Sequence, residues 1–207
     1  MSKKGPFVAA SVFPELKYGG YLPLHTESRF DIAASQLPKT HKWRQALHPE
    51  ASVLNGLYDA KFDNSVYFTY TLDLFQNIIE LSEKISTKYR NHKTWSEDES
   101  WRFSPSENYL PLVKLQMQMQ IIKKIKHGFD EARFSKMLEE SIQRKSGILL
   151  YAKDVNGNPL SGLFILYDST TAYLITQADS LEARALGPLS IRLIWEGIIW
   201  VKNHTSC

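Results

Sequence analysis

The sequence predicts an α+β fold in which a mixed, mostly antiparallel sheet is flanked by helices. Three features of the 207 residues indicate this class. Residues 147–177 hold three apolar runs separated by two turn signals, which is typical of an antiparallel meander. An amphipathic helix precedes the meander, and a helix that is apolar nearly all round follows it. Hydrophobic residues make up 43% of the chain, which is enough to bury a core.

Turn residues delimit the three strands of the meander. The first run begins at Gly147, and the runs are rich in Ile, Leu and Tyr. The pair Asn156-Gly157 predicts a two-residue type I′ turn, because that turn needs two residues that tolerate a positive φ. The Ser-Thr-Thr sequence at 169–171 closes the second hairpin. The third strand is expected to end at Gln177.

A polar loop leads from the third strand to the last helix. Gly187 lets the backbone turn, and Pro188 suits the first helical position, where no N–H group is needed. We expect the helix from Leu189 onward to be buried, because most of its residues are apolar: Ile191, Leu193, Ile194, Trp195, Ile198, Ile199, Trp200 and Val201. A turn that exposes backbone N–H groups at the start of a buried helix is suited to bind an anion.

Two helices and a short strand are predicted before the meander. Asp130 caps the second helix, whose buried face has helical spacing: Phe134, Met137, Leu138, Ser141 and Ile142. Residues 113–121 alternate apolar and polar, as a strand does, but they are strong helix formers, so we favour a helix. Pro111 kinks this helix or delays its start. The short strand is expected at residues 101–103.

The first half of the chain is predicted to be mixed in structure. Two strand-like pieces are expected in residues 6–24, a short helix at 26–37, irregular chain at 39–56 and a hairpin at 57–74. A longer helix should run from Phe75 to about Thr94. We divide the chain into an N-terminal portion, residues 1–95, and a core, residues 96–207.

Composition and motifs exclude several classes of function. The net charge of +3 is weak evidence for a nucleic-acid partner, which we do not expect. The single cysteine, Cys207, allows neither an internal disulfide nor a cysteine-based metal site, and we expect no metal. No run approaches the roughly 20 apolar residues of a membrane span, and no secretory signal is present, so we expect a cytoplasmic protein without a membrane partner. Serine-hydrolase, zinc-protease and P-loop motifs are absent.

One segment, AYLITQADSLEARALGPLSIRLIWEGIIW at residues 172–200, resembles a known family. It is similar to the acyl-CoA-binding half of the GNAT acyltransferase superfamily, and more narrowly to the GNAT-like proteins related to the Fem aminoacyltransferases. The residues that match are Tyr173, Leu174, Asp179, Glu182, Arg184, Gly187, Ser190, Leu193, Trp195, Glu196 and Ile198. The segment departs from the family pattern at Gln177-Ala178, where the family is glycine-rich, and at Pro188-Leu189, where a small residue is usual.

The resemblance implies an enzyme, an N-acyltransferase that moves an acyl group from acyl-CoA (acetyl-CoA) to an amine or peptide acceptor. It implies a pyrophosphate cradle made of one side chain and four backbone N–H groups, from Arg184, Leu186, Gly187, Leu189 and Ser190. Backbone groups at Thr176 and Gln177 would hold the pantetheine arm. No general base can be named. Candidate catalytic groups are Tyr167 and Tyr173, as acids for the leaving thiolate, and Glu182.

The predicted helix at 75–94 ends in a basic segment that resembles a family segment near the substrate groove. Lys88, Arg90 and Lys93 would then hold an anionic substrate group. The alternative is a solvated basic helix end, which the helix dipole favours. Both interpretations stay open at this point.

Two other functions fit the same resemblance. A Fem-like enzyme would use aminoacyl-tRNA as the donor, although no long helical arm is predicted. A non-catalytic binding module would keep only the core of the fold. The resemblance covers the middle part of the family fold and implies that both ends are truncated, with the last strands missing. We therefore expect an open sheet edge at 172–177 in a fragment, a truncated gene product, or a homodimer that completes the sheet.

Overall fold

The computed structural model describes residues 70–92, 101–125 and 129–205, together with the backbone of three short strands near the N-terminus. The chain divides into two compact units, Met1–Thr71 and Leu72–Cys207. The domain boundary predicted between residues 95 and 96 lies outside the described residues. The expected helix at 26–37 and most of the hairpin expected at 57–74 also lie outside them.

The first unit contains a small sheet in the order β1-β2-β3. Strand β1 (Ser2–Lys4) pairs antiparallel with β2 (Phe7–Ser11), and β2 pairs parallel with β3 (Lys42–Arg44). The strand predicted near residue 7 is therefore confirmed. The prediction of irregular chain at 39–56 is wrong at β3. The hairpin expected at 57–74 is also wrong at its C-terminal end, since residues 70–72 have no regular structure.

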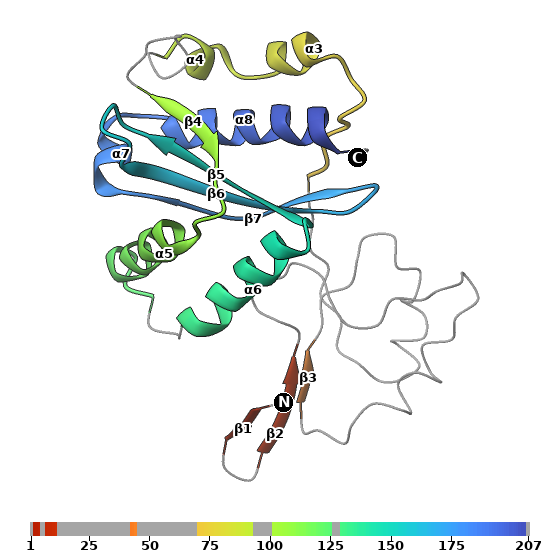
Figure 1. Cartoon of the computed structure of the whole chain (residues 1–207), viewed down its shortest axis with the longest axis vertical. Coiled ribbons are helices and arrows are strands. Elements are labelled where there is room, and N and C mark those ends of the chain that lie inside the picture. Colours follow the sequence, from red (N-terminus) through yellow and green to blue (C-terminus); the bar gives the residue numbers. More distant parts are fainter. Residues whose placement is uncertain are drawn as a thin grey trace, which may run out of the picture. The chain divides into compact units, whose positions relative to one another are not determined.

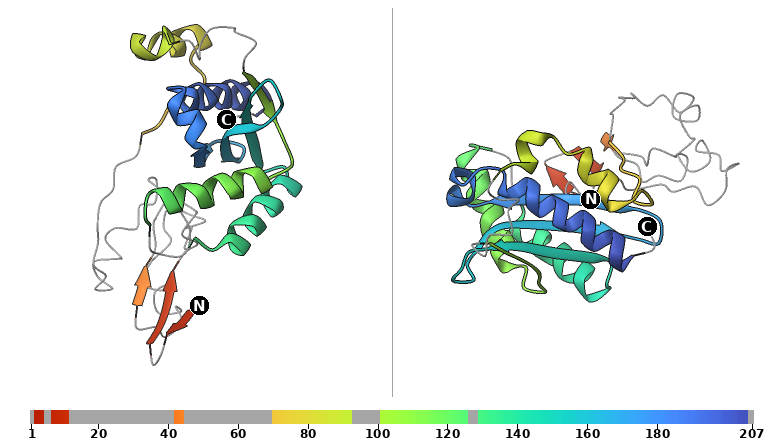
Figure 2. Two further views of the ribbon diagram at one scale, coloured as in Figure 1. Left: turned by 90° about the vertical axis from the view of Figure 1, so that its left-hand side faces the viewer. Right: turned by 90° about the horizontal axis from the view of Figure 1, so that it is seen from above.

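The second unit is built around a four-stranded antiparallel sheet in the order β4-β5-β6-β7. The strands are β4 (Arg102–Pro105), β5 (Gly147–Lys153), β6 (Pro159–Tyr167) and β7 (Ala172–Asp179). Helices α5 (Leu110–Ile122) and α6 (Glu131–Gln143) cover one face, and α8 (Leu189–His204) covers the other (Figures 1 and 2). The predicted α+β class, with its meander and flanking helices, is confirmed.

Strand alternation gives each face of the sheet its own core. On the α5/α6 face, Leu149, Tyr151 and Phe164 pack with Leu112 of α5 and Leu138 of α6. On the α8 face, the neighbouring strand residues pack with the buried side of α8: Leu150, Ala152, Leu163, Ile165, Leu189, Leu193 and Val201. Every residue from Leu189 to Lys202 is buried or partly buried, so the prediction of an enclosed last helix is confirmed.

The smaller helices correct two predictions. The helix expected from Phe75 to about Thr94 is two short helices, α3 (Ile78–Glu83) and α4 (Thr87–Arg90), because α3 closes at Lys84 and Ser86 begins a new turn. The loop expected after the third strand contains α7 (Leu181–Ala185), and β7 runs two residues further than predicted. Lys202 of α8 donates to the carbonyl of Leu74 at 2.5 Å, which ties α8 to the segment before α3.

The first hairpin turn differs from the predicted type I′. The N–H of Gly157 donates to the carbonyl of Asp154 at 3.0 Å, and Gly157 has φ +83°, whereas Asn156 does not have a positive φ. The carboxylate of Asp154 accepts N–H groups from Asn156 at 2.9 Å and from Asn158 at 2.7 Å. These bonds favour a wider turn in which only the glycine needs the left-handed region. The second turn is as predicted, with the N–H of Asp168 bonded to the carbonyl of Thr171 at 3.0 Å.

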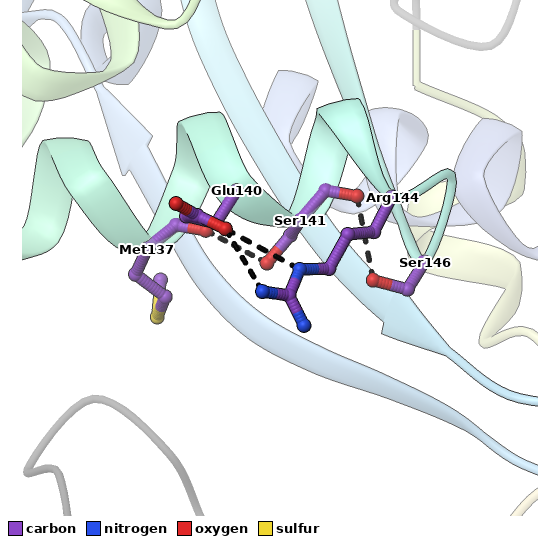
Figure 3. Close-up of polar contacts among 5 residues, drawn as sticks. All are labelled: Met137, Glu140, Ser141, Arg144 and Ser146. Atoms are coloured by element: carbon purple, nitrogen blue, oxygen red, sulfur yellow. Dashed lines mark hydrogen bonds and ion pairs between the residues drawn. The ribbon is translucent and has the colours of Figure 1, made fainter.

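Helix α6 begins and ends as its sequence requires. The carboxylate of Asp130 accepts the N–H of Arg133 at 3.0 Å, which confirms the predicted cap. At the other end Lys145 takes a left-handed φ of +53° and lets the chain turn into β5. Figure 3 shows the last turn, where Arg144 reaches back to Glu140 at 3.1 Å and Ser141 donates to the carbonyl of Met137 at 2.7 Å.

Tyr151 joins the middle of the sheet to the start of α5. Its hydroxyl accepts the N–H of Leu112 at 3.0 Å and donates to the carbonyl of Asn108 at 2.9 Å, and its side chain is 1% exposed. Burial raises the pKa of the Tyr151 phenol well above its usual range. The N–H of Leu112 lies in the first turn of α5, where no helical acceptor exists, so the phenol satisfies an otherwise unpaired donor.

Replacing Tyr151 with Phe should lower the free energy of unfolding by about 1–3 kcal/mol, because the buried N–H of Leu112 loses its partner and the carbonyl of Asn108 loses a hydrogen bond. Urea denaturation followed by circular dichroism measures the loss. The control is Tyr70→Phe, since Tyr70 is fully exposed and should change stability by less than about 0.5 kcal/mol. Equal stability of the Tyr151 variant and the wild type would contradict this role.

The stability of the hairpin turn at 154–158 should depend on pH. Hydrogen bonds, first from the Asn158 side chain and then from backbone N–H groups, lower the pKa of Asp154. The stabilisation is therefore present above the ordinary carboxyl pKa of about 3.9 and is lost as the pH falls through the lower, folded-state value. Amide resonances of Asn156 and Asn158 should titrate with an apparent pKa below about 3.9. Asn158→Ala should move that pKa upward, and an unchanged value would contradict the assignment.

Candidate functional site

The predicted anion-binding turn joins α7 to α8. The hydroxyl of Ser180 caps α7 by accepting the N–H of Ala183 at 3.0 Å. Gly187 then takes φ +104°, a left-handed conformation that favours glycine. Pro188 is the cap of α8 rather than its first helical residue, so the predicted position of this proline is off by one. The turn places the start of a 16-residue helix beside the end of β7.

Two of the four predicted backbone donors are already used inside the chain. The N–H of Leu186 lies 3.2 Å from the carbonyl of Glu182, and the N–H of Leu189 donates to the carbonyl of Gly187 at 2.9 Å. Among the described residues, no backbone acceptor bonds the N–H groups of Gly187 and Ser190. A cradle at this turn would therefore rest on these two N–H groups and on the dipole of α8.

His92, two residues past the end of α4, lies against the turn. A Cβ built on Gly187 would stand 2.6 Å from Cε1 and 2.7 Å from Nε2 of His92. The structure thus brings the end of the basic segment, in which the side chains of Lys88 and Arg90 are exposed, next to the predicted cradle. Lys93 lies outside the described residues. The absence of a side chain at Gly187 is what lets the imidazole approach the backbone.

Arg184, the predicted cradle side chain, is exposed on α7. Its guanidinium contacts the sulfur of Met119 on α5. Helix α7 and the second half of α5 therefore meet at the β7 edge of the sheet. No group of three or more His, Cys, Asp or Glu side chains among the described residues could hold a metal ion.

Strand β7 is one end of the four-stranded sheet, and it carries an irregularity next to the predicted pantetheine contacts. Phe164 pairs with Thr176 but Ile165 pairs with Leu174, so Ile175 is an extra residue on β7. The side-chain amide of Gln116 on α5 donates to the hydroxyl of Thr176 and, at 3.3 Å, to the carbonyl of Gln177. A bulge of this kind bends the strand and disrupts the ladder locally.

A second polar pair follows at the end of β7. The hydroxyl of Ser161, which is fully buried, donates to the carboxylate of Asp179 at 2.5 Å. The amide of Gln177 approaches the same oxygen at 3.5 Å. These bonds fix the end of β7 just before α7 begins.

The candidate catalytic residues are not gathered at one point. Tyr167 ends β6, with its ring centroid 5.8 Å from that of Trp200 on α8, and Tyr173 pairs with Leu166 at the start of β7. Both tyrosines therefore lie at the opposite end of β7 from Gln177. Glu182 is exposed in α7, and Glu196 is ion-paired with Arg192 at 2.5 Å. The two tyrosines therefore lie away from the predicted cradle, whereas Glu182 lies in the helix just before it.

Sequence reasoning missed three residues of this region: Gln116, His92 and Ser161. Gln116 could have been found, because it lies one turn from Leu112 on the buried face of a helix, where a polar residue needs a partner. His92 and Ser161 had no comparable signal, since their partners, Gly187 and Asp179, are distant in the sequence.

Comparisons with known proteins supply no relative. The chain matches no family model, no curated protein and no solved structure. The geometry of the second unit is therefore the basis for the functional argument.

Replacing Gly187 with Ala should destabilise the chain more than replacing Gly157 with Ala. Both glycines have a positive φ, but a methyl group meets His92 at Gly187 and open space at Gly157. The difference should be roughly 1 kcal/mol or more, the usual cost of overpacking. Thermal unfolding of the two variants measures it. Equal losses of stability would show that His92 does not occupy this place.

Proposed function

We propose that this chain is an N-acyltransferase of the GNAT type, related to the Fem enzymes, which transfers an acyl group from acyl-CoA to an amine. The observation that carries the proposal is the order and placement of the elements. Strand β4 is followed by α5 and α6 on one face, then by the β5-β6-β7 meander, the turn and the enclosed helix α8 on the other face. Two helices, an antiparallel meander, a loop and a buried helix form the order that the GNAT resemblance implies.

The start of α8 supports a role in binding the diphosphate of CoA. The N–H groups of Gly187 and Ser190 lie at the positive end of a long helix, and Arg184 lies one turn before them. A helix N-terminus with donors of this kind favours a phosphate group. His92 lies against the same turn and would add a ring N–H donor, or be displaced, when a phosphate binds.

Strand β7 supports a role in holding the pantetheine arm. An edge strand presents backbone N–H and C=O groups that are not used by a neighbouring strand. The two amide groups of pantetheine would bond to such groups near the bulge at Ile175. Gln116 holds the carbonyl of Gln177 and the hydroxyl of Thr176, so it would position this stretch of β7.

The proposed reaction is attack of the amine nitrogen on the thioester carbonyl. A C–N bond forms, the C–S bond breaks, the amine loses a proton to solvent water and the sulfur leaves as a thiolate. An arm that runs from the start of α8 back along β7 would carry the thioester toward the half of the strand that contains Tyr173. We therefore propose Tyr173, ahead of Tyr167 and Glu182, as the acid that protonates the thiolate.

A non-catalytic binding module is the second candidate. The contact of His92 with Gly187 favours it, because the imidazole covers part of the backbone that a phosphate would approach. The two candidates differ in one measurable property. The enzyme binds acetyl-CoA and free CoA, and the module binds neither.

Isothermal titration calorimetry of the full chain with acetyl-CoA and with free CoA tests the proposal. Both ligands should bind, and Arg184→Ala should weaken binding by roughly ten- to a hundredfold, because a charge-assisted bond to phosphate is lost. Arg144→Ala is the matched control, since Arg144 is an exposed arginine paired with Glu140 on α6 (Figure 3). Absence of heat with the folded wild-type chain would refute the acyltransferase and leave the binding module.

A further inference from the structure

Helix α5 has apolar side chains on two opposite faces. One face packs on the sheet through Leu112, Val113, Leu115 and Gln116. On the other face Leu110, Met117 and Ile121 are 56%, 38% and 76% exposed. Their spacing of seven and four residues places them in line along one side of a helix. Such a row is unusual, because a surface helix normally turns polar residues outward.

The row continues into the end of α5. Residues 121–125 are all exposed, and Ile122 and Ile125 are 39% and 49% exposed. Lys124 takes a left-handed φ of +51° and ends the helix. Three isoleucine and two lysine side chains are therefore presented together at one tip. We call residues 110, 114, 117 and 121–125 the α5 outer face.

The charge of this segment has one sign. Residues 108–129 contain four lysines and neither aspartate nor glutamate, in a chain whose net charge is only +3. Lys114 on α5 is exposed, and so are Lys123 and Lys124, which directly follow the helix. A second copy of α5 would bring lysines against lysines, so self-pairing through this face is disfavoured. The complementary surface must be both apolar and anionic.

We propose that the α5 outer face binds the surface of an anionic lipid bilayer, independently of the proposed acyltransferase function. The isoleucine, leucine and methionine side chains enter the boundary between headgroups and acyl chains, and the lysine ammonium groups reach the lipid phosphates. None of the described helices is long and apolar enough to cross a bilayer, but a surface contact does not need such a helix. The sequence expectation of no membrane partner rested on the missing span and the missing secretory signal, and neither bears on a surface contact.

Flotation of the full chain with phosphatidylcholine vesicles, prepared with and without phosphatidylserine, tests this proposal. The chain should float with the phosphatidylserine vesicles and remain below with the neutral ones. Ile121→Glu should weaken binding by about tenfold or more, because a buried apolar side chain is lost and a repelled charge is gained. The pair Lys123→Glu and Lys124→Glu should weaken it similarly and remove its dependence on salt.

The matched control is Ile79→Glu, on α3. Ile79 is 64% exposed, and this substitution changes the net charge as Ile121→Glu does, so it should leave binding unchanged. Far-ultraviolet circular dichroism should be the same for all variants, since the substituted side chains are exposed. Failure of the wild type to float with anionic vesicles overturns the proposal and favours an acidic helix of a partner protein. The proposal is also overturned if the chain floats equally well with neutral vesicles, or if Ile79→Glu weakens binding as much as Ile121→Glu does.

Discussion

Burial of the β5-β6 hairpin on both faces is the constraint on which the second unit depends. Leu149 and Tyr151 point to α5 and α6, whereas Leu150 and Ala152 point to α8. A slip of one residue in the pairing would send each set to the wrong layer. The two helix layers are therefore specified together with the register. This double burial also explains why β5 and β6 are almost continuously apolar, a pattern that antiparallel strands with one wet face do not show.

The same constraint locates the candidate site. Because β7 follows β6 at the end of the sheet, its outer backbone edge faces no described strand. The chain must then cross to the α8 face within the short segment that holds α7 and Gly187. The connection through α7 thus brings the start of α8 close to the end of β7. This proximity follows from the fold itself. Gln116 and Ser161 brace the end of β7 from opposite faces of the sheet.

Much of this architecture could be predicted from the sequence because the signals are local. Apolar runs between turn residues gave the meander, and the Asp130 cap with helical spacing gave α6. Helix α7 was missed because five residues are too few to show a period. The break at Lys84 was missed because neither glycine nor proline marks it. The turn at Asp154 differs from prediction because a carboxylate competes with the type I′ geometry for the same N–H groups. The contacts of Gln116 and His92 join residues far apart in sequence, which periodicity cannot reveal.

Helix α5 has one face that packs in the core and a second apolar face that does not. Its core face is held on the sheet by Leu112, by the phenol of Tyr151 and by the amide of Gln116. None of these contacts involves the apolar residues of the outer face. An exposed isoleucine by itself needs no explanation, but a row of them bordered by lysines and free of acids does. Packing within the described chain does not account for that row. We therefore attribute the row to a contact between α5 and a surface outside the chain.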